Sequence, residues 1–598
     1  MTTSYPETWD LDVFFQGGSH SPQFAAHLEK TSGYVKALQK FVQQITVPQN
    51  ASDTKEIEEA LEHVKIVRQH ISQAGAYLSC LTAQNIKDNK AMQLLGELSA
   101  LSAESTQAFQ KLRLLIGQID SATFEQLLET ESLSPFAFLL TEWREASKEL
   151  LSEEEEALIA TLSVDGYKAW DQLYDLLISD IRIEVEIDGV VQSLSVGQAN
   201  NLSAHQDSKV RKSAFEAIEK VFTEREEFFA KTLNHIAGFR LNVYKKRDWN
   251  NVLKEPLTIN RMKEETLDAM WGAIAERKET FTRYLTHKAQ MLGDEKLNWY
   301  DFDAPVSKAT AKMDYQEGAA FILKHFGRFS KQLEAFSRTA FEEGWIEVEN
   351  RDNKKPGGFC TSFPLHKQSR IFMTYSGTMS NVATLAHELG HAFHTYALRP
   401  VHPLNTGYAM NVAETASTFA EMIVADAAVQ EATTKEEKIA LIEDKVQRSV
   451  AFFMNIHARF LFETRFYEER KTGIVSSQRL SELMEEAQRE AHGDALGETH
   501  PHFWATKLHF FITGVPFYNF PYTFGYLFSL SIYAKAQEAG TDFEDSYISL
   551  LQDTAVMSVE DLALKHLGED ITKRDFWLKG IALCERDVEQ FIMLTSEE

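Results

Sequence analysis

Two histidines four residues apart, with a glutamate directly after the first, form the stretch of this sequence best suited to chemistry. His387-Glu388-Leu389-Gly390-His391 reads H-E-x-x-H inside a segment that is expected to be helical. Residues four apart lie on one face of a helix, so the two imidazoles could bind one zinc ion at ~2.0–2.1 Å each. The glutamate between them would reach the attacking water as a general base. The spacing therefore predicts zinc-assisted hydrolysis.

A further histidine, His394, lies on the same helical face. It follows His387 by seven residues, ~10.5 Å along the helix axis at 1.5 Å per residue, which is too far for both to bind one ion. Pairing His391 with His394 would leave Glu388 below the metal rather than beside the water. We therefore expect His387 and His391 to be ligands, and His394 to be either a neighbour of the site or a residue that supports a ligand.

A catalytic zinc ion uses three protein ligands and keeps one position open. The sequence has no H-x-x-G-x-x-H extension that would supply a third histidine. The next expected helix begins near Asn411 and carries Glu414, 23 residues after His391. An antiparallel helix pair would return Glu414 to the metal, and Glu421, two turns later, would hydrogen-bond a ligand histidine. Small residues on this helix allow close approach: Ala413, Ala416 and Ala420. Cobalt or manganese could occupy the same ligands.

Helical periodicity dominates the chain around these motifs. Apolar residues recur every three to four positions from 52 to 71, and similar patterns cover 206–244, 263–292 and 435–471. The dominant pattern predicts a mainly α-helical protein.

Two segments depart from the helical pattern. Residues 181–187 alternate strictly between apolar and charged side chains and then meet Asp188-Gly189, which predicts a β-hairpin. Residues 345–375 predict a small sheet directly before the H-E-x-x-H helix. An extended peptide could add itself as a strand along an exposed edge of this sheet. Alternatively, the sheet only packs beneath the helix, and the sequence does not decide between the two.

Composition limits the partners that this chain can have. Its 61 basic and 88 acidic residues give a formal charge of −27, which excludes most nucleic-acid-binding proteins because phosphate binding needs a basic face. An acidic surface could attract cationic peptides, but it is equally typical of an ordinary soluble protein.

The cellular location follows from what the sequence does not contain. Cys80, Cys360 and Cys584 are too few and too scattered for a disulfide framework, which fits a reducing compartment. We find no basic and apolar signal segment at the N-terminus and no apolar run long enough to cross a membrane. The sequence therefore predicts a cytoplasmic protein with no membrane partner.

Together these motifs resemble the oligoendopeptidase F group of the thimet-oligopeptidase-like zinc metallopeptidases. The resemblance rests on 378–394, which contains H-E-x-x-H, and on 411–417, with further similarity at 8–15 and 570–577. It implies a two-lobed helical enzyme with a deep substrate channel, which cleaves short unfolded oligopeptides and excludes folded proteins. It also implies that one Zn²⁺ is bound by His387, His391 and Glu414.

The same resemblance implies a second group of residues late in the chain. A histidine and tyrosines, here His509, Tyr518 and Tyr522, would lie over the substrate carbonyl. A phenol that donates to the oxyanion is worth about 3–4 kcal/mol. Which tyrosine is the donor stays open at this point.

Substrate contacts are expected beside the sheet and on the late aromatic helix. Gly357 and Gly358 precede the expected edge strand, where glycine allows a peptide backbone to approach closely, and they are similar to a family loop beside the channel. Phe372, Thr374 and Tyr526 complete the expected substrate-binding residues.

We expect two domains, an N-terminal helical lobe over 1–200 with a hairpin near 181–195, and a catalytic domain over 201–598. One alternative is a carboxypeptidase or dipeptidase, which would need a fixed cation such as Arg370 or Lys367 to hold the substrate terminus. Another is an inert peptide-binding protein, although the intact Glu388 argues against it.

Overall fold

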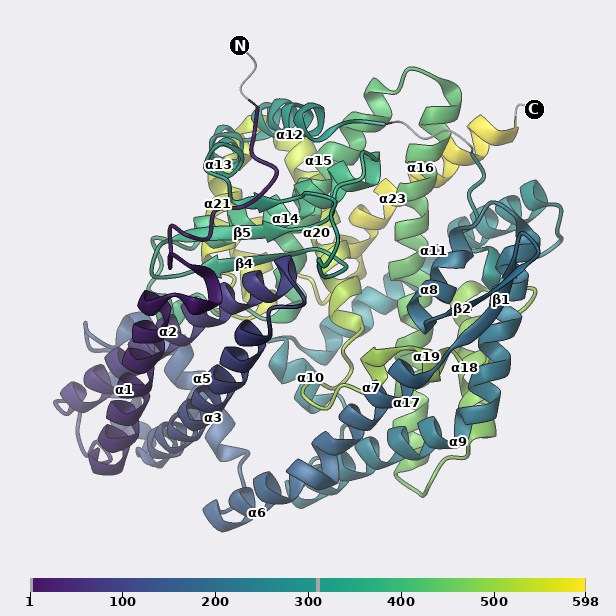
Figure 1. Ribbon diagram of the computed structural model, residues 1–598. Helices are drawn as coiled ribbons and strands as arrows, with labels where there is room; N and C mark the ends of the chain where they lie inside the picture. Colours follow the sequence, from purple (N-terminus) through teal and green to yellow (C-terminus); the bar gives the residue numbers. More distant parts are fainter. Residues whose placement is uncertain (1–3, 308–311, 597–598) are drawn as a thin grey trace.

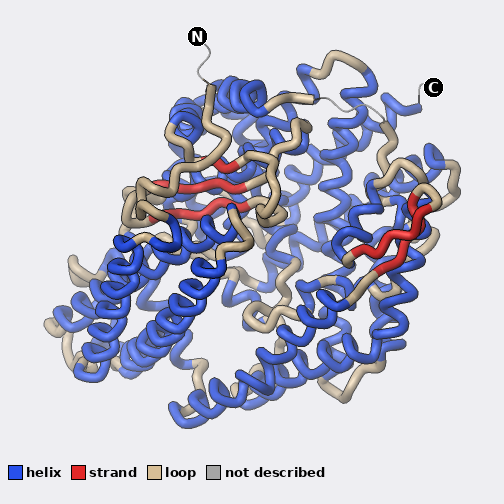
Figure 2. The backbone as a smooth tube through the Cα atoms, in the orientation of Figure 1, coloured by secondary structure: helices blue, strands red, loops and turns tan. Residues whose placement is uncertain are grey.

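The structure is a computed structural model that describes residues 4–307 and 312–596. Helices make up most of it, as the apolar periodicity predicts (Figures 1 and 2). The described strands form one two-stranded and one three-stranded sheet. The chain is therefore a mainly α-helical protein with two small sheets.

An N-terminal group of helices packs as a layer of its own, on the left of Figure 1. Polar side chains cap several of them, as at Ser21, Asp88 and Asp120. Apolar stripes then bury two hydrophobic clusters between the helices. The helices are α1 (Pro22–Gln44), α2 (Thr54–Gln84), α3 (Asn89–Gln118), α4 (Ser121–Leu128) and α5 (Ala137–Lys148).

The middle of the chain contains the predicted hairpin. Strand β1 (Ile183–Ile187) pairs antiparallel with β2 (Val190–Leu194), and Asp188 and Gly189 both have positive φ, as a type I′ turn requires. The surrounding helices are α6 (Glu153–Ser163), a π-helical turn (Val164–Lys168), α7 (Ala169–Asp180), α8 (Val196–Asn200), α9 (Ser208–Lys246), α10 (Lys254–Ile259) and α11 (Glu264–Leu292).

The second sheet lies where the sequence predicts it. Its order is β3 (Ile346–Glu347), β5 (Gln368–Phe372) and β4 (Phe359–Phe363), with β5 parallel to β3 and antiparallel to β4. Strand β4 is therefore an edge strand, and no described backbone group pairs with its outer side.

The remaining helices form the larger part of the molecule. They are α12 (Tyr315–Phe329), α13 (Lys331–Glu342), α14 (Met379–Ala397), α15 (Met410–Glu431), α16 (Lys435–Val450), α17 (Ile456–Arg470), α18 (Ser477–His492), α19 (Phe503–Thr506), α20 (Phe520–Ala539), α21 (Glu544–Asp553), α22 (Val559–Leu567) and α23 (Arg574–Ser596). Helix α15 lies between α14 and α20 and packs on both.

The hydrophobic cores divide the chain before the hairpin. The two N-terminal clusters run from Trp9 to Trp143 and add only Phe363, Phe372 and Leu404 from later segments. The main cluster begins at Tyr174 and includes the hairpin. The domain boundary at residue 200 stays a prediction, since the cores separate earlier in the sequence.

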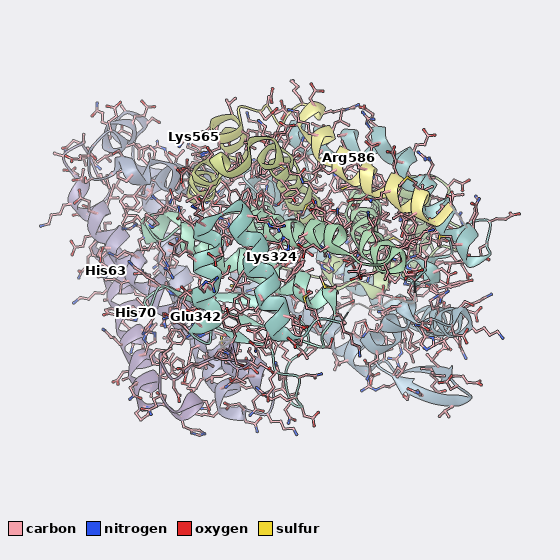
Figure 3. The ribbon with its side chains drawn as sticks, turned by 90° about the horizontal axis from the view of Figure 1, so that it is seen from above. His63, His70, Lys324, Glu342, Lys565 and Arg586 are labelled. Atoms are coloured by element: carbon pink, nitrogen blue, oxygen red, sulfur yellow. The ribbon has the colours of Figure 1, made fainter. Side chains whose placement is uncertain are left out.

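Charged side chains cover the outer faces of the helices. Lys324, Lys565 and Arg586 are exposed and come from α12, α22 and α23 (Figure 3). Within 4–307 and 312–596, we find no helix that combines the length and apolar character needed to cross a membrane.

Candidate metal centre

Helix α14 presents the H-E-x-x-H residues. Thr378 caps its first turn in a reciprocal capping box with Asn381. At Gly390 the helix meets α15 so closely that an added Cβ would lie 2.4 Å from the carbonyl oxygen of Ala416. Only glycine fits this crossing, so Gly390 allows α15 to bring its carboxylates next to the histidines.

His387, His391 and Glu414 come together between α14 and α15. The Nε2 atoms of His387 and His391 lie 3.2 and 3.5 Å from Glu414 Oε2. One ligand atom from each residue lies within 4.8 Å of the others. Two imidazole nitrogens and one carboxylate oxygen are a donor set that suits a catalytic zinc ion, with one position left open. The donor chemistry fits the metal that the spacing predicts.

Three further side chains orient these ligand residues. Ser417 Oγ donates to Glu414 Oε2 at 2.7 Å, and Glu421 Oε2 lies 3.2 Å from His387 Nδ1. Arg448 of α16 pairs with the other oxygen of Glu421. A carboxylate on the second nitrogen of a ligand histidine fixes its ring and tautomer. The contact of Glu421 is the one expected from its spacing. Ser417 and Arg448 were not predicted.

The electrostatics keep Glu414 and His391 in the forms that bind a metal. Burial alone would raise the pKa of Glu414, but the His387 hydrogen bond and both imidazole charges lower it to about 2. Burial lowers the pKa of His391 to about 4. At neutral pH the pair therefore consists of a carboxylate and a neutral imidazole, as coordination requires.

Glu388 is positioned differently from the ligand residues. It is 7% exposed, and its Oε2 has no hydrogen-bond partner among the described residues. Burial, followed by the charge of Glu414, raises its pKa to about 7 despite the opposing effect of His387. A carboxyl with such a pKa is suited to take up and release a proton near neutral pH.

Gly358 places the start of β4 against Glu388. A Cβ at Gly358 would lie 3.6 Å from Glu388 Oε1 and 3.2 Å from the carbonyl oxygen of Phe372. Gly357 has φ +91°, which other residues rarely adopt. The two glycines thus lead the edge strand past the candidate base.

Helix α20 closes the other side of the centre. At Gly525 an added Cβ would lie 2.8 Å from the carbonyl oxygen of Asn411 and 3.0 Å from Glu414 Cβ, so α20 also touches α15 through a glycine. Pro521 occupies the first turn of α20, where no backbone donor is needed. Tyr522 lies one turn before Gly525 and is therefore near Glu414.

His509 and the two tyrosines form one cluster. The ring of Tyr518 lies 5.5 Å from that of His509 and 5.8 Å from that of Tyr522, and the His509 and Tyr522 rings are 6.3 Å apart, centroid to centroid. Burial, the neighbouring Tyr518 and the charge of Glu414 raise the pKa of Tyr522. The phenol therefore keeps its proton and can donate it in a hydrogen bond.

His509 is neutral at physiological pH. Burial, followed by the charges of Arg459 and Lys507, lowers its pKa to about 4. Its Nδ1 is buried without a partner among the described residues. The ring is thus available as a neutral donor or acceptor rather than as a cation.

The expectation that His394 supports a metal ligand is wrong. Its Nε2 lies 2.9 Å from Thr554 Oγ1, its ring stacks on Tyr408, and it is 0% exposed. The physical reason is its position along the helix: two turns beyond His387, α14 faces α21 and no longer faces Glu414. His394 holds helices together and does not support a metal ligand.

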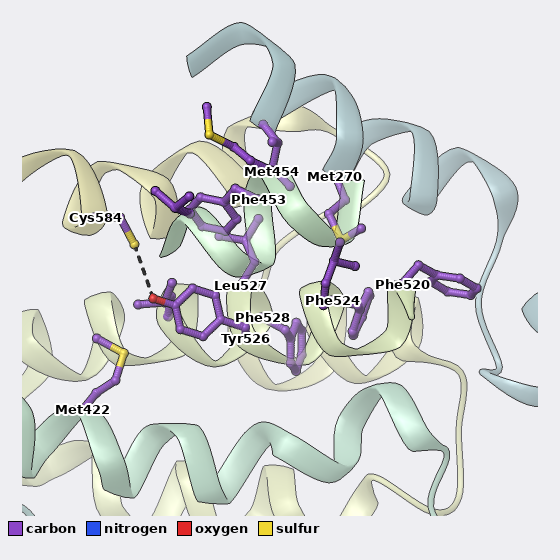
Figure 4. Close-up of a cluster of buried hydrophobic side chains, with 14 of the residues drawn as sticks. Met270, Met422, Phe453, Met454, Phe520, Phe524, Tyr526, Leu527, Phe528 and Cys584 are labelled. Carbon is purple, nitrogen blue, oxygen red and sulfur yellow. Dashed lines mark hydrogen bonds between the residues drawn. The ribbon is translucent and has the colours of Figure 1, made fainter. Parts of the chain in front are cut away.

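Two expected substrate contacts are also wrong. Tyr526 is buried in the aromatic core, and its hydroxyl lies 3.1 Å from Ser449 Oγ and near Cys584 (Figure 4). From Thr523 to Tyr533 every residue of α20 is buried, so Tyr526 lies inside the core. Phe372 is 0% exposed and stacks on Phe359, because β5 is the central strand. The contact expected of Thr374 stays a prediction.

Comparison with known proteins decides the family. The model of Peptidase family M3 matches residues 201–583, and the model named Oligopeptidase F matches residues 116–183. The chain belongs to peptidase family M3. This M3 peptidase is therefore assigned to a family of metallopeptidases, and peptide hydrolysis is the activity that membership supports.

Individual relatives of this M3 peptidase are similar along nearly the whole chain. An oligoendopeptidase F homolog of Lactococcus lactis subsp. lactis is 23% identical over 99% of this chain and 97% of the relative. Oligopeptidase PepF of Bacillus subtilis is 23% identical over 95% of this chain and 84% of the relative. The crystal structure of oligoendopeptidase-F from Enterococcus faecium matches with a TM-score of 0.72 and 19% identity, over 96% and 99% of the two chains. The last comparison shows the shared fold.

Proposed function

We propose that this M3 peptidase is a zinc-dependent endopeptidase that hydrolyses short, unfolded oligopeptides. The observation that carries the proposal is the meeting of His387, His391 and Glu414 next to a buried carboxyl, Glu388. Such a donor set with an adjacent base is the arrangement used in zinc-assisted peptide hydrolysis.

The metal site would be held by the two histidines and Glu414. A bound zinc ion supplies Lewis acidity, which polarises a carbonyl and makes water a better nucleophile. Glu421 and Ser417 keep the ligand side chains in place through the hydrogen bonds described above.

Glu388 would act as the general base and then as the acid. Its free Oε2 can accept the proton of the attacking water, and its raised pKa lets it pass that proton to the leaving amine. The nitrogen of the scissile bond leaves as a neutral amine only if it gains this proton. One carboxyl can therefore serve both halves of the reaction.

Tyr522 is the preferred oxyanion donor of the two tyrosines. It lies on α20 one turn before Gly525, which touches Glu414, and its phenol keeps its proton. The rings of Tyr518 and His509 lie 5.8 and 6.3 Å from its ring and can orient it. The outer edge of β4 offers backbone groups that would hold the peptide in an extended form.

The remaining parts of the proposal concern the whole enzyme. We infer a substrate channel between an N-terminal lobe and a catalytic domain, divided near residue 200, and a cytoplasmic location. The three cysteines are free, which fits a reducing compartment.

The test is hydrolysis of an internally quenched fluorescent oligopeptide by the purified protein. We expect turnover that a chelator abolishes and that zinc restores, with cleavage at an internal bond in the product spectrum. Absence of turnover in zinc-loaded protein, or turnover that resists metal removal, would reject the proposal.

A further inference from the structure

Two cationic side chains beside His509 have no carboxylate partner. Arg459 of α17 donates to amide oxygens, through Nε to Asn455 Oδ1 at 2.9 Å and through Nη1 to Asn519 Oδ1 at 3.0 Å. Neither Arg459 nor Lys507 forms an ion pair with any residue that the structure describes. Acidic residues outnumber basic ones by 88 to 61 in this chain, so the unpaired state does not reflect a shortage of acids.

The two cations share one aromatic ring. The guanidinium carbon of Arg459 lies 5.2 Å from the ring centroid of Phe503, and Lys507 Nζ lies 4.8 Å from it. The charges are thus within about 10 Å of each other and repel. Burial, followed by the charge of Arg459, lowers the pKa of Lys507 to about 8. An anion between the two would relieve both the repulsion and the loss of hydration.

A cavity of about 190 Å³ is lined by Lys507 and by Asn455, the hydrogen-bond partner of Arg459. Aromatic side chains line part of it, as in many ligand pockets, and the wall includes Phe215, Trp299, Tyr300, Asn455, Phe503 and Lys507.

The other charges of this cavity already have partners. Arg211 pairs with Asp301 at 2.8 Å, and Asp303 accepts a hydrogen bond from Ser203 Oγ at 2.8 Å. Asp303 attracts Lys507 but forms no ion pair with it. Lys507 is therefore a cation of the cavity wall that has no ion-pair partner among the described residues, and it can bind an anionic ligand.

The cations flank the carbonyl side of the candidate active site. Lys507 precedes His509 by two residues, and Arg459 donates to Asn519, the residue directly after Tyr518. A peptide whose scissile carbonyl faces Tyr522 could thus extend its C-terminal part toward them. The sequence-based candidate Arg370 does not fit this role, because it is 1% exposed and donates to the carbonyl oxygen of Asp10.

We propose, on the basis of the proposed peptidase function, that Arg459 and Lys507 bind the free C-terminal carboxylate of the peptide substrate, with its last side chain in the aromatic cavity. A carboxylate matches the planar donors of arginine. The aromatic walls favour a large apolar or aromatic final residue. This subsite would restrict the enzyme to peptides short enough for their end to reach it.

The test compares three quenched peptides: the free acid, the C-terminal amide of the same sequence, and an amide in which the last residue is replaced by aspartate. In the wild type we expect kcat/KM for the acid to exceed that for the amide by about 10- to 100-fold, the range for a hydrogen bond to a charged group. Lys507→Met keeps the stem over Phe503 and should reduce this ratio toward one. Lys507→Arg should retain the preference, and Lys324→Met, on the outer surface, is the matched control.

Several outcomes would overturn the inference. Equal cleavage of acid and amide by the wild type would do so while leaving the proposed function intact. Full rescue by the aspartyl amide would assign the cations to an acidic side chain instead of the chain terminus. A parallel loss on both peptides in a Lys507→Met protein with an unchanged melting temperature would show a merely structural role.

Binding provides a readout that does not depend on turnover. Fluorescence anisotropy of the labelled acid and amide on Glu388→Gln protein should show the same preference for the acid. If the wild type cleaves neither peptide, the proposed function fails, and this binding ratio still decides the inference. A ratio near one would overturn it.

Discussion

The two halves of the candidate site are built in different ways. The metal half lies on two long helices, α14 and α15, whose crossing at Gly390 leaves no space for a Cβ. The carbonyl half lies on a short 3₁₀ turn (Leu508–Phe510), a loop, and the first turn of α20. Its residues are separated by loop positions rather than by helical turns.

This difference affects how firmly each half is held. Hydrogen bonds from Ser417 and Glu421 fix Glu414 and His387, and Arg448 in turn fixes Glu421. In the other half, His509 Nδ1 and Asn519 Nδ2 have no partner among the described residues. The side chains of the metal half are thus held by more hydrogen bonds than those of the carbonyl half. In such an arrangement, substrate binding can bring the carbonyl-half side chains into their final positions.

Among substitutions in the carbonyl half, removal of the Tyr522 hydroxyl should lower kcat the most. We expect Tyr522→Phe to lower kcat by about 10²- to 10³-fold, because one oxyanion donor is lost. Metal content should not change. Tyr518→Phe, the matched variant, should cost less than Tyr522→Phe. A larger loss in Tyr518→Phe would exchange the roles of the two tyrosines.

Loss of the Glu421 charge tests whether this carboxylate strengthens metal binding by orienting His387. Glu421→Gln should weaken zinc binding by about 10- to 100-fold, since the carboxylate that orients His387 is neutralised. Competition with a chromogenic chelator measures the affinity. An unchanged affinity would mean that Glu421 serves only its ion pair with Arg448.

The close contact between α14 and α15 at Gly390 predicts that a larger residue there destabilises the fold. Gly390→Ala should lower the free energy of unfolding by about 1–3 kcal/mol, because the added methyl meets the α15 backbone. Gly96→Ala is the control: its Cβ position in α3 is open, so the change should stabilise by up to about 1 kcal/mol. Equal melting temperatures of the two variants would contradict the close crossing.

The sequence predicts the metal half better than the carbonyl half. Four-residue spacing on one helix places His387 and His391 side by side without any knowledge of the fold. The alanine-rich face of the next helix then indicates Glu414. Arg448 could not be found in this way, because it comes from α16 and meets Glu421 only through tertiary packing.

Errors arise where residues on one face of a helix are assumed to meet the same neighbour. His394 shares a face with His387 on a helical projection, but it faces Thr554 of a different neighbour. Tyr526 follows Tyr522 by one turn, but it is already inside the core. The helices and both small sheets could be predicted from periodicity and turn residues, whereas the neighbours of each helix could not.

The central claim is that Glu388 is the base beside a metal held by His387, His391 and Glu414. The most direct test is Glu388→Gln, with metal content and turnover measured on the same sample, and with the exposed Glu342→Gln as control. We predict that the variant binds one zinc ion per protein and that its kcat is about 10²- to 10⁴-fold lower than that of the wild type. Turnover close to that of the wild type, with the metal bound, would contradict the account.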